Sequence, residues 1–345
     1  MRDIDPAGRR LIEYVIDLAE VEGSIALFPH ERYDADAIGA AVSLAMAFRK
    51  LGCRTAVLAD EATPESLACL PGLEEVIVYD DSTSCDAYDF AIAVDCHDPE
   101  RMGRRAACYE RIAHHATIDH HVFEGERGRL DYIDSSAASS CQLVFEIIWQ
   151  LEYYATQPFF DPTIAELLLA GTITDTGRYT YSNTTPLCLR QAAFLLERFP
   201  IDLTALHYEL YERTTIGRLQ IQGDIFASIE SHDDGNILFA HVTRKQLEAR
   251  GVRDDDLSNF ASVIRNAEGV GVAFLFVEQS KGVRVNIRSN DCFDAAAFAK
   301  RFGGGGHRRA AGMTIDDLSL DEAMAKVARE AKRTLDACRE ASEDR

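Results

Sequence analysis

The sequence predicts an α/β protein in which an N-terminal, mainly parallel sheet flanked by helices is linked to a smaller, mixed α/β C-terminal domain. In the first half of the chain, near-continuous apolar segments alternate with helical ones, which is typical of a parallel sheet covered on both faces. After Gly235 the alternation restarts around a hairpin-like pair of segments, which indicates a separate mixed unit. The length of 345 residues is sufficient for about two domains.

The first sheet is expected from short apolar segments bounded by polar loops. These segments cover residues 24–28, 55–59, 74–79, 89–95 and 115–119. Helices are expected where apolar residues recur every three to four positions, over residues 36–52, 137–151 and 163–174. We therefore divide the chain into a first domain, a helical linker and a second domain, over residues 1–190, 191–225 and 226–345.

The second domain is expected to combine strands and helices. Its predicted strands cover residues 236–242, 270–278 and 281–289, the last two as a hairpin. Its predicted helices cover residues 254–267, 293–302 and 320–339. Alternation along 281–289 places Arg284, Asn286 and Arg288 on one face of that strand.

Composition excludes several classes of protein. The chain has 36 Lys and Arg against 57 Asp and Glu, a formal net charge of −21, so a broad basic face for long nucleic acid is not expected. No apolar run approaches the ~18 residues of a membrane span, and the N-terminal residues lack the apolar core of a secretory signal. We expect a folded, cytoplasmic protein that binds no membrane.

The nine cysteines are dispersed along the chain and include no closely spaced pair. Disulfide frameworks and thiolate zinc sites both require clustered, paired spacing. We therefore expect the cysteines to be reduced and mostly structural.

Histidine and aspartate residues lie at or just after the ends of three predicted strands and one predicted helix. They are His30, Asp34 and Asp36 after the first strand, Asp95 at the end of 89–95, Asp119, His120 and His121 at the end of 115–119, and Asp175 directly after the helix 163–174. The carboxyl ends of parallel strands meet at one edge of a sheet, where ligands bind. Converging carboxylates repel one another unless a cation neutralises them, and oxygen ligands with a few imidazoles suit Mn²⁺ or Mg²⁺. Two ions that share one carboxylate would form the clamp used in phosphate-ester hydrolysis.

Each of these residues also has a structural interpretation when taken alone. Asp34 or Asp36 could cap the helix that follows, and Asp95 could be a turn residue. His120 could be a buried histidine with a satisfied ring. The coincidence of four such segments at the ends of predicted elements favours the metal site.

These four segments, in this order, resemble the four motifs of the DHH phosphoesterase superfamily. The segment GGGGHRRAAG, residues 303–312, resembles the signature of the DHH-associated C-terminal domain. In length and two-domain layout the chain is similar to the nano-RNase and 3′-phosphoadenosine-5′-phosphate (pAp) phosphatase branch. The first motif departs slightly, because Tyr33-Asp34-Ala35-Asp36 stands where relatives often have a Pro-Asp pair, but both ligand positions are filled.

The resemblance implies the roles of the metal-site residues. His30, Asp34 and Asp95 would hold one Mn²⁺. The second Mn²⁺ would be held by Asp36, Asp95, His120 and Asp175, with Asp95 bridging and Mg²⁺ as the alternative ion. His121 would contact a phosphate oxygen or the leaving group, and Asp119 would orient a histidine. These residues make the first domain the catalytic one.

The second domain is expected to bind substrate, with the active site in the cleft between the two domains. The glycine run lets a backbone approach an anion closely, and a helix expected from His307 onwards would offer free amides. The candidate residues are Arg288, which resembles the phosphate-binding arginine of the family, Gly305, Gly306 and His307. Arg101 and Arg178, shortly after Asp95 and Asp175, are weaker candidates in the first domain. The alternative is that the glycine run is a flexible loop. Ser139 and Ser140 are interpreted first as helix N-terminal residues and second as substrate contacts.

The resemblance implies an Mn²⁺-dependent phosphohydrolase that degrades short 5′-phosphorylated oligonucleotides, such as linear pApA or pGpG, to nucleoside monophosphates. Removal of the 3′-phosphate from pAp, alone or as a second activity, is the alternative. A non-catalytic nucleotide-binding regulator is disfavoured because every ligand position is filled. Dimers are common in the family, so the resemblance also allows a homodimer.

Overall fold

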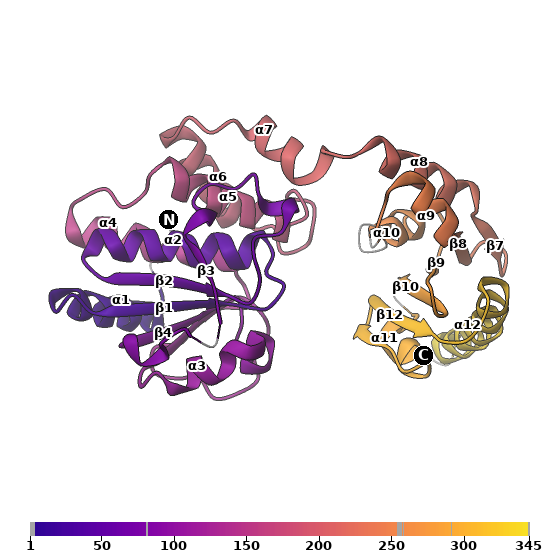
Figure 1. Cartoon of the computed structure of the whole chain (residues 1–345), viewed down its shortest axis with the longest axis horizontal. Helices are drawn as coiled ribbons and strands as arrows, with labels where there is room; N and C mark the ends of the chain where they lie inside the picture. The colour runs from indigo at the N-terminus through magenta and orange to yellow at the C-terminus, as the bar shows by residue number, and fades with distance from the viewer. Residues whose placement is uncertain (1–3, 81, 254–256, 258, 291, 344–345) are drawn as a thin grey trace. The chain divides into compact units, whose positions relative to one another are not determined.

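The computed structural model describes residues 4–80, 82–253, 257, 259–290 and 292–343. The chain forms two compact units, Met1–Arg213 and Thr214–Arg345 (Figure 1). The division between the units falls inside the predicted helical linker, residues 191–225. In the described parts of the chain, no helix is both long enough and apolar enough to cross a membrane.

The first unit contains a six-stranded, all-parallel sheet in the order β3-β2-β1-β4-β5-β6. Its strands are β1 (Ser24–Pro29), β2 (Arg54–Ala59), β3 (Val76–Val78), β4 (Phe90–Val94), β5 (His115–Asp119) and β6 (Tyr132–Ile133). The five predicted strands are confirmed. The sixth, β6, was missed because two residues carry no periodic pattern.

Helices cover both faces of this sheet, as the apolar strands predict. The helices are α1 (Pro6–Glu20), α2 (Ala35–Leu51), α3 (Ala106–Arg111), α4 (Ser140–Ala155), α5 (Pro162–Asp175), α6 (Pro186–Arg198) and α7 (Leu203–His207). Short 3-10 turns are η1 (Glu65–Leu67), η2 (Leu73–Glu75), η3 (Cys85–Ala87) and η4 (Pro99–Arg105), and a π-helical turn is η5 (Tyr208–Glu212). Figure 1 shows α2 on one side of the sheet and α3 on the other. Accordingly, Ile25 and Leu27 of β1 pack in the core that contains α2, and Ala26 and Phe28 pack in the core that contains α3 residues.

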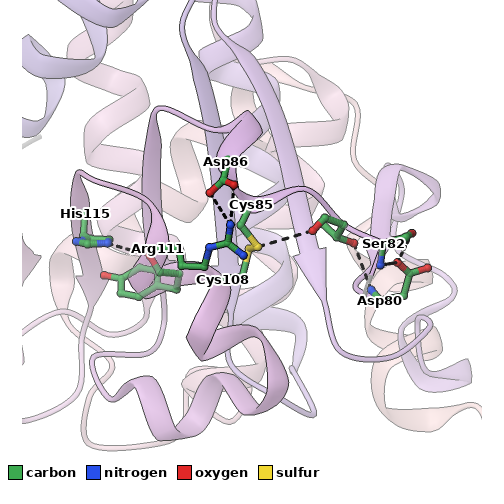
Figure 2. The surroundings of a disulfide bond; sticks show 9 residues. Asp80, Ser82, Cys85, Asp86, Cys108, Arg111 and His115 are labelled. Carbon is green, nitrogen blue, oxygen red and sulfur yellow. Dashed lines mark hydrogen bonds and ion pairs between the residues drawn. A yellow bond between two sulfur atoms is a disulfide. The ribbon is translucent and has the colours of Figure 1, made fainter.

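The prediction of reduced cysteines is wrong for one pair. Cys85 in η3 and Cys108 in α3 form a disulfide with Cα atoms 5.3 Å apart (Figure 2). Both side chains are buried in the apolar core on the α3 side of the sheet, and the Asp86–Arg111 ion pair joins the same two segments. Free cysteines are Cys53, Cys69, Cys96, Cys141, Cys188 and Cys292. Tertiary packing brings together two cysteines that are 23 residues apart, and sequence spacing alone does not reveal it.

The second unit contains a mixed sheet in the order β11-β12-β10-β9-β8-β7, in which only β8 and β9 are parallel. Its strands are β7 (Glu230–His232), β8 (Ile237–Val242), β9 (Val272–Glu278), β10 (Val283–Ser289), β11 (Gly305–His307) and β12 (Ala310–Ile315). Its helices are α8 (Ile216–Ala227), α9 (Arg244–Arg250), α10 (Phe260–Arg265), α11 (Ala295–Lys300) and α12 (Leu320–Glu343). The predicted β9–β10 hairpin is confirmed; residues 254–256 and 258 of the predicted helix 254–267 lie outside the described residues.

The helix predicted from His307 onwards is wrong. The glycine-rich segment instead forms an antiparallel β11–β12 hairpin that turns at Arg308 and Arg309. Along β12, Ala311, Met313 and Ile315 are buried while the residues between them are more exposed, which is the period of a strand. The alanines and arginines of this segment suit a helix by propensity, but its burial against the second core fixes it as a strand.

Candidate metal centre

The predicted metal ligands lie at the carboxyl edge of the first sheet. Strands β1, β4 and β5 are neighbours, so the segments that follow them lie side by side. His30 and Asp34 follow β1, and Asp36 lies in the first turn of α2. Asp95 directly follows β4, and His120 directly follows β5. Asp175 is the last residue of α5, which packs against α2.

Side chains at this edge form three groups whose ligand atoms lie within 4.8 Å of one another. The groups are His30, Asp34 and Asp95; Asp95, His120 and His121; and Asp36, His120 and Asp175. The structure therefore brings together all six residues that were predicted as ligands, with His121 beside them. Asp95 and His120 each belong to two groups, which joins the three into one centre.

Asp95 is held at the middle of this centre by its backbone and by Ser140. Its φ of 58° is in the left-handed region, and its N–H donates to the carbonyl of Ile118 over 2.8 Å. The Ser140 hydroxyl donates to Asp95 Oδ1 over 2.8 Å. Nε2 of His30 lies 3.5 Å from Oδ2 of Asp95, and Nε2 of His120 lies 3.5 Å from Oδ1. The two carboxylate oxygens thus face different histidines, as a bridging ligand requires.

Asp36 is fully buried and is held by the N-terminus of α4. The N–H groups of Ser140 and Cys141 donate to its two carboxylate oxygens over 2.7 and 2.9 Å. Free amides and the helix dipole favour a carboxylate at this position. Ser140 therefore fixes both Asp36 and Asp95. The prediction that Ser140 begins a helix is confirmed, but its support of Asp36 was missed because that contact spans 104 residues.

His30 and Asp34 each use one side-chain atom in a hydrogen bond to the backbone, which leaves a second atom as a ligand for a cation. Nδ1 of His30 is 2.7 Å from the carbonyl of Glu31, which can only accept, so Nδ1 carries a proton and, in the neutral ring, Nε2 carries the lone pair. Asp34 caps α2 through Oδ1, which accepts from the N–H groups of Asp36 and Ala37. The capping interpretation of Asp34 is confirmed, and its second oxygen stays available as a ligand.

Asp119, the buried last residue of β5, orients two histidines. Its oxygens lie 2.7 Å from Nδ1 of His121 and 2.5 Å from Nδ1 of His97. Burial alone would raise the pKa of Asp119, but the hydrogen bonds from His121 and His97 outweigh it and hold that pKa well below its ordinary value. Sequence reasoning missed His97. Its position two residues after Asp95 was the available signal.

Negative charge exceeds positive charge in this centre. Burial, reinforced by the charges of Asp95 and Asp175, raises the pKa of Asp36 well above its ordinary value. Burial and the charge of Asp95 also raise the pKa of Asp34. Burial would lower the pKa of His120, but the Asp175 carboxylate nearby and the charge of Asp36 raise it to about 10. Protons thus partly replace the cations that these carboxylates require.

The donor set fits divalent cations. Nε2 of His120 lies 3.0 Å from Asp175 Oδ2, yet this buried atom makes no hydrogen bond of good geometry among the described residues. A cation among Asp36, His120 and Asp175 would satisfy this nitrogen and neutralise the carboxylates. Carboxylate oxygens with imidazole nitrogens, and without a thiolate, suit Mn²⁺ or Mg²⁺.

Arg101 and Arg178 lie in the same unit as the centre, and both are exposed. The Arg178 guanidinium lies 4.9 Å from the centre of the Tyr211 ring. Within the described residues, neither arginine forms an ion pair with a carboxylate, so both are available to an anion. The other four predicted substrate residues, Arg288, Gly305, Gly306 and His307, lie in the second unit, and the predicted cleft between the domains stays a prediction.

Two family models match the chain. The model for the DHH family, N-terminal domain, matches residues 24–172, and the model for the DHHA1 domain matches residues 234–335. The first match contains every member of the three metal-binding groups except Asp175, and the second contains the glycine-rich hairpin.

Several known proteins are similar over most of the chain. The bifunctional oligoribonuclease and PAP phosphatase NrnA of Thermus thermophilus is 32% identical over 311 residues, which are 90% of each chain. An exopolyphosphatase-related protein of Bacteroides fragilis has a similar structure, with a TM-score of 0.83, 21% identity, and coverage of 95% of this chain and 97% of its own. RecJ of Thermus thermophilus in complex with Mn²⁺ has a TM-score of 0.57 and 16% identity, over 95% of this chain and 55% of RecJ. The last two similarities show the fold.

Proposed function

We propose, because the chain belongs to the DHH phosphoesterase family and within it to the NrnA branch, that it hydrolyses short 5′-phosphorylated oligonucleotides to nucleoside monophosphates. Linear dinucleotides such as pApA and pGpG are the substrates we expect, and removal of the 3′-phosphate from pAp is the second activity. The observation that carries the proposal is the shared position of Asp95 in two groups of ligands at the carboxyl edge of the sheet. The name of the Thermus relative, which combines both activities, supports the pairing.

The centre would hold two divalent cations, which we propose are Mn²⁺, with Mg²⁺ as the alternative. His30, Asp34 and Asp95 would hold one ion, and Asp36, Asp95, His120 and Asp175 the other. A bound pair of cations withdraws electron density from a phosphate and makes water a stronger nucleophile. The chemistry of the donors supports this choice, as does the Mn²⁺ in the RecJ structure of similar fold.

The side chains around the cations would position the substrate and move protons. Asp119 accepts from Nδ1 of His121, so Nε2 would be the ring nitrogen of His121 that hydrogen-bonds a phosphate oxygen or the leaving group. Ser140 holds Asp95 and Asp36 in place, so that neither carboxylate has to reorganise during the reaction. Arg101 and Arg178 would add positive charge for the phosphate in the first unit.

A direct test is to incubate the purified chain and Mn²⁺ with pApA, pGpG or pAp and to follow the products by chromatography. We expect mononucleotides from the dinucleotides and AMP from pAp, and no product when EDTA is added. Turnover of pAp alone would contradict the oligonucleotide activity. Tight binding of all three nucleotides without any product would favour the non-catalytic regulator instead.

Metal binding is expected to release protons. His120, with its pKa raised to about 10, carries a proton at pH 7 in the metal-free protein, whereas an imidazole ligand must be neutral. Mn²⁺ binding at pH 7 should therefore release about one proton from His120. As the pH is raised toward 10, the apparent affinity for Mn²⁺ should increase by up to about tenfold per pH unit. Calorimetry in two buffers with different ionisation enthalpies measures this release.

The exposed His114 provides a matched control for the proton release, because it belongs to none of the three groups. The His114→Gln variant should release the same number of protons as the unaltered chain. Equal binding heats in the two buffers, with an affinity for Mn²⁺ that does not change with pH, would contradict the charged state of His120.

A homodimer and a cytoplasmic location stay predictions.

A further inference from the structure

Two arginines of the second unit, Arg265 and Arg288, lie close together. Arg265 is the last residue of α10, and Arg288 lies on β10. Burial and the positive charge of Arg265 both lower the pKa of Arg288, which reflects the proximity of the two guanidinium groups. Within the described residues, neither arginine forms an ion pair. This arrangement is unusual in a chain whose acidic residues exceed its basic residues by 21.

Among the residues that the structure describes, the hydrogen-bond partners of these two arginines are uncharged. Nη1 of Arg265 donates to Oδ1 of Asn290 over 2.8 Å. Nε of Arg288 donates to the Ser262 hydroxyl over 3.1 Å, and Nη1 donates to the carbonyl of Ile287 over 3.0 Å. Neutral acceptors fix the two side chains but do not neutralise them. No carboxylate in the described part of the second unit pairs with either positive charge, so both are offered to a ligand.

The positions of both guanidinium groups are set in advance by α10 and β10. Ser262 and Arg265 are three residues apart and thus neighbours on α10. The backbone N–H of Asn290 donates to the carbonyl of Gly271, and its side-chain Nδ2 donates to the carbonyl of Val270. These two bonds hold Asn290 in place, with Oδ1 as the acceptor for Arg265. Nε of Arg265 is buried and has no hydrogen-bond partner among the described residues. A buried donor without a partner costs about 1–3 kcal/mol, which an acceptor on a ligand would recover.

The arginine pair borders the glycine-rich hairpin. In the sheet register Arg288 is opposite Ala310, and Ala310 is opposite His307. Residues directly opposite one another have side chains on the same face, so Arg288 and His307 emerge on one face, two strands or about 10 Å apart. Two residues along the same face, Gly312 of β12 is opposite Gly305 of β11. A Cβ at Gly305 would meet no atom within 4 Å. Small, partly exposed residues, Ala310 and Gly312, therefore lie on β12 between the strands of Arg288 and His307.

We propose that Arg265 joins Arg288 in binding the terminal phosphate of the substrate, and that Arg265 makes the protein select 5′-phosphorylated over 5′-hydroxyl oligonucleotides. This inference rests on the proposed function. A phosphodiester carries one negative charge, whereas a terminal phosphate carries about −1.5 to −2 at neutral pH. Two guanidinium groups match the charge of the terminal phosphate, and planar guanidinium groups bind phosphate oxygens in pairs.

The test compares pApA with ApA, which differ only in the terminal phosphate. In the unaltered chain with Mn²⁺, kcat/KM should be higher for pApA. The Arg265→Gln variant should lose about tenfold to hundredfold in kcat/KM on pApA and little on ApA. Arg265→Lys, which keeps a charge and a donor for Asn290, should lose less. If Arg265→Gln lowers kcat/KM equally for both substrates, or does not lower it for pApA, the proposed role of Arg265 is overturned.

Binding measurements separate this inference from the proposed function. Calorimetry of pApA and ApA uses the Asp95→Asn protein without added Mn²⁺, so that hydrolysis does not interfere. It should show tighter binding of pApA, and adding Arg265→Gln should remove most of that difference. Equal affinities for the two dinucleotides would overturn the inference even if the unaltered chain hydrolyses both. A retained preference in binding, with no hydrolysis by the unaltered chain, would instead contradict only the proposed function.

Arg244→Gln is the matched control, because it removes one arginine from the same unit. Arg244 is exposed, pairs with Glu248, and donates its backbone N–H to Glu278 at the far end of β9. Arg288 is opposite Ala273, five residues and about 17 Å along that strand from Glu278. The control should leave the ratio of kcat/KM for pApA and ApA unchanged, and a fall equal to that of Arg265→Gln would overturn the specific role of Arg265.

Discussion

Replacing Asp95 with asparagine is expected to lower kcat on pApA by about 10³-fold while the fold persists. Asparagine keeps the shape of the side chain and an oxygen that can accept from Ser140. It also tolerates the left-handed backbone at this position, where φ is 58°, better than alanine would. The substitution therefore removes mainly the negative charge that His30 and His120 face from two sides.

The loss of the cation site can be measured separately from catalysis. Mn²⁺ at about a hundred times its dissociation constant should stabilise the unaltered chain by about 2.7 kcal/mol, and so raise its Tm. Asp95→Asn should lose most of this increase. Asp98→Asn is the matched control, because Asp98 lies in the same loop, caps η4 and belongs to none of the three groups. Full activity of Asp95→Asn would contradict a centre that depends on Asp95.

The ligands at the strand ends could be predicted because they depend only on topology. Once β1, β4 and β5 are assigned as parallel strands, their carboxyl ends must meet at one edge, and the residues that follow them must lie together. His30, Asp95 and His120 needed no further information. The resemblance to the family then added the sharing of Asp95 between two ions, which spacing alone does not specify.

The residues that support these ligands could not be predicted, because their contacts depend on how helices pack. Ser140 reaches Asp36 and Asp95 only because α4 begins where α2 begins. His97 reaches Asp119 across two neighbouring strand ends. Arg265 belongs to none of the sequence motifs that predicted the site. Its proximity to Arg288 follows from the packing of α10 on β10. Sequence pattern identifies which side chains face a core or an edge, but not which pairs meet there.

The contact between α5 and α2 next to the metal centre predicts a second large effect, at Gly171. A Cβ at this position would overlap Cys141 Sγ and lie only 2.8 Å from the Asp36 Cα and 2.9 Å from its Oδ1. Because the backbone of α2 cannot yield as a flexible side chain would, Gly171→Ala should displace Asp36 and destabilise the protein by about 1–3 kcal/mol. A shift of about 1 Å in a positioned group can cost about 10²-fold in rate, so kcat should fall by about that factor.

Gly223→Ala separates this steric effect from the helix propensity of alanine. Gly223 lies inside α8, and a Cβ there would meet no atom within 4 Å. The same substitution should therefore stabilise the protein by up to about 1 kcal/mol and leave kcat unchanged. Denaturant unfolding and initial rates on pApA measure both variants. If Gly171→Ala is as stable and as active as Gly223→Ala, then the close approach of α5 to Asp36 does not hold this carboxylate in place.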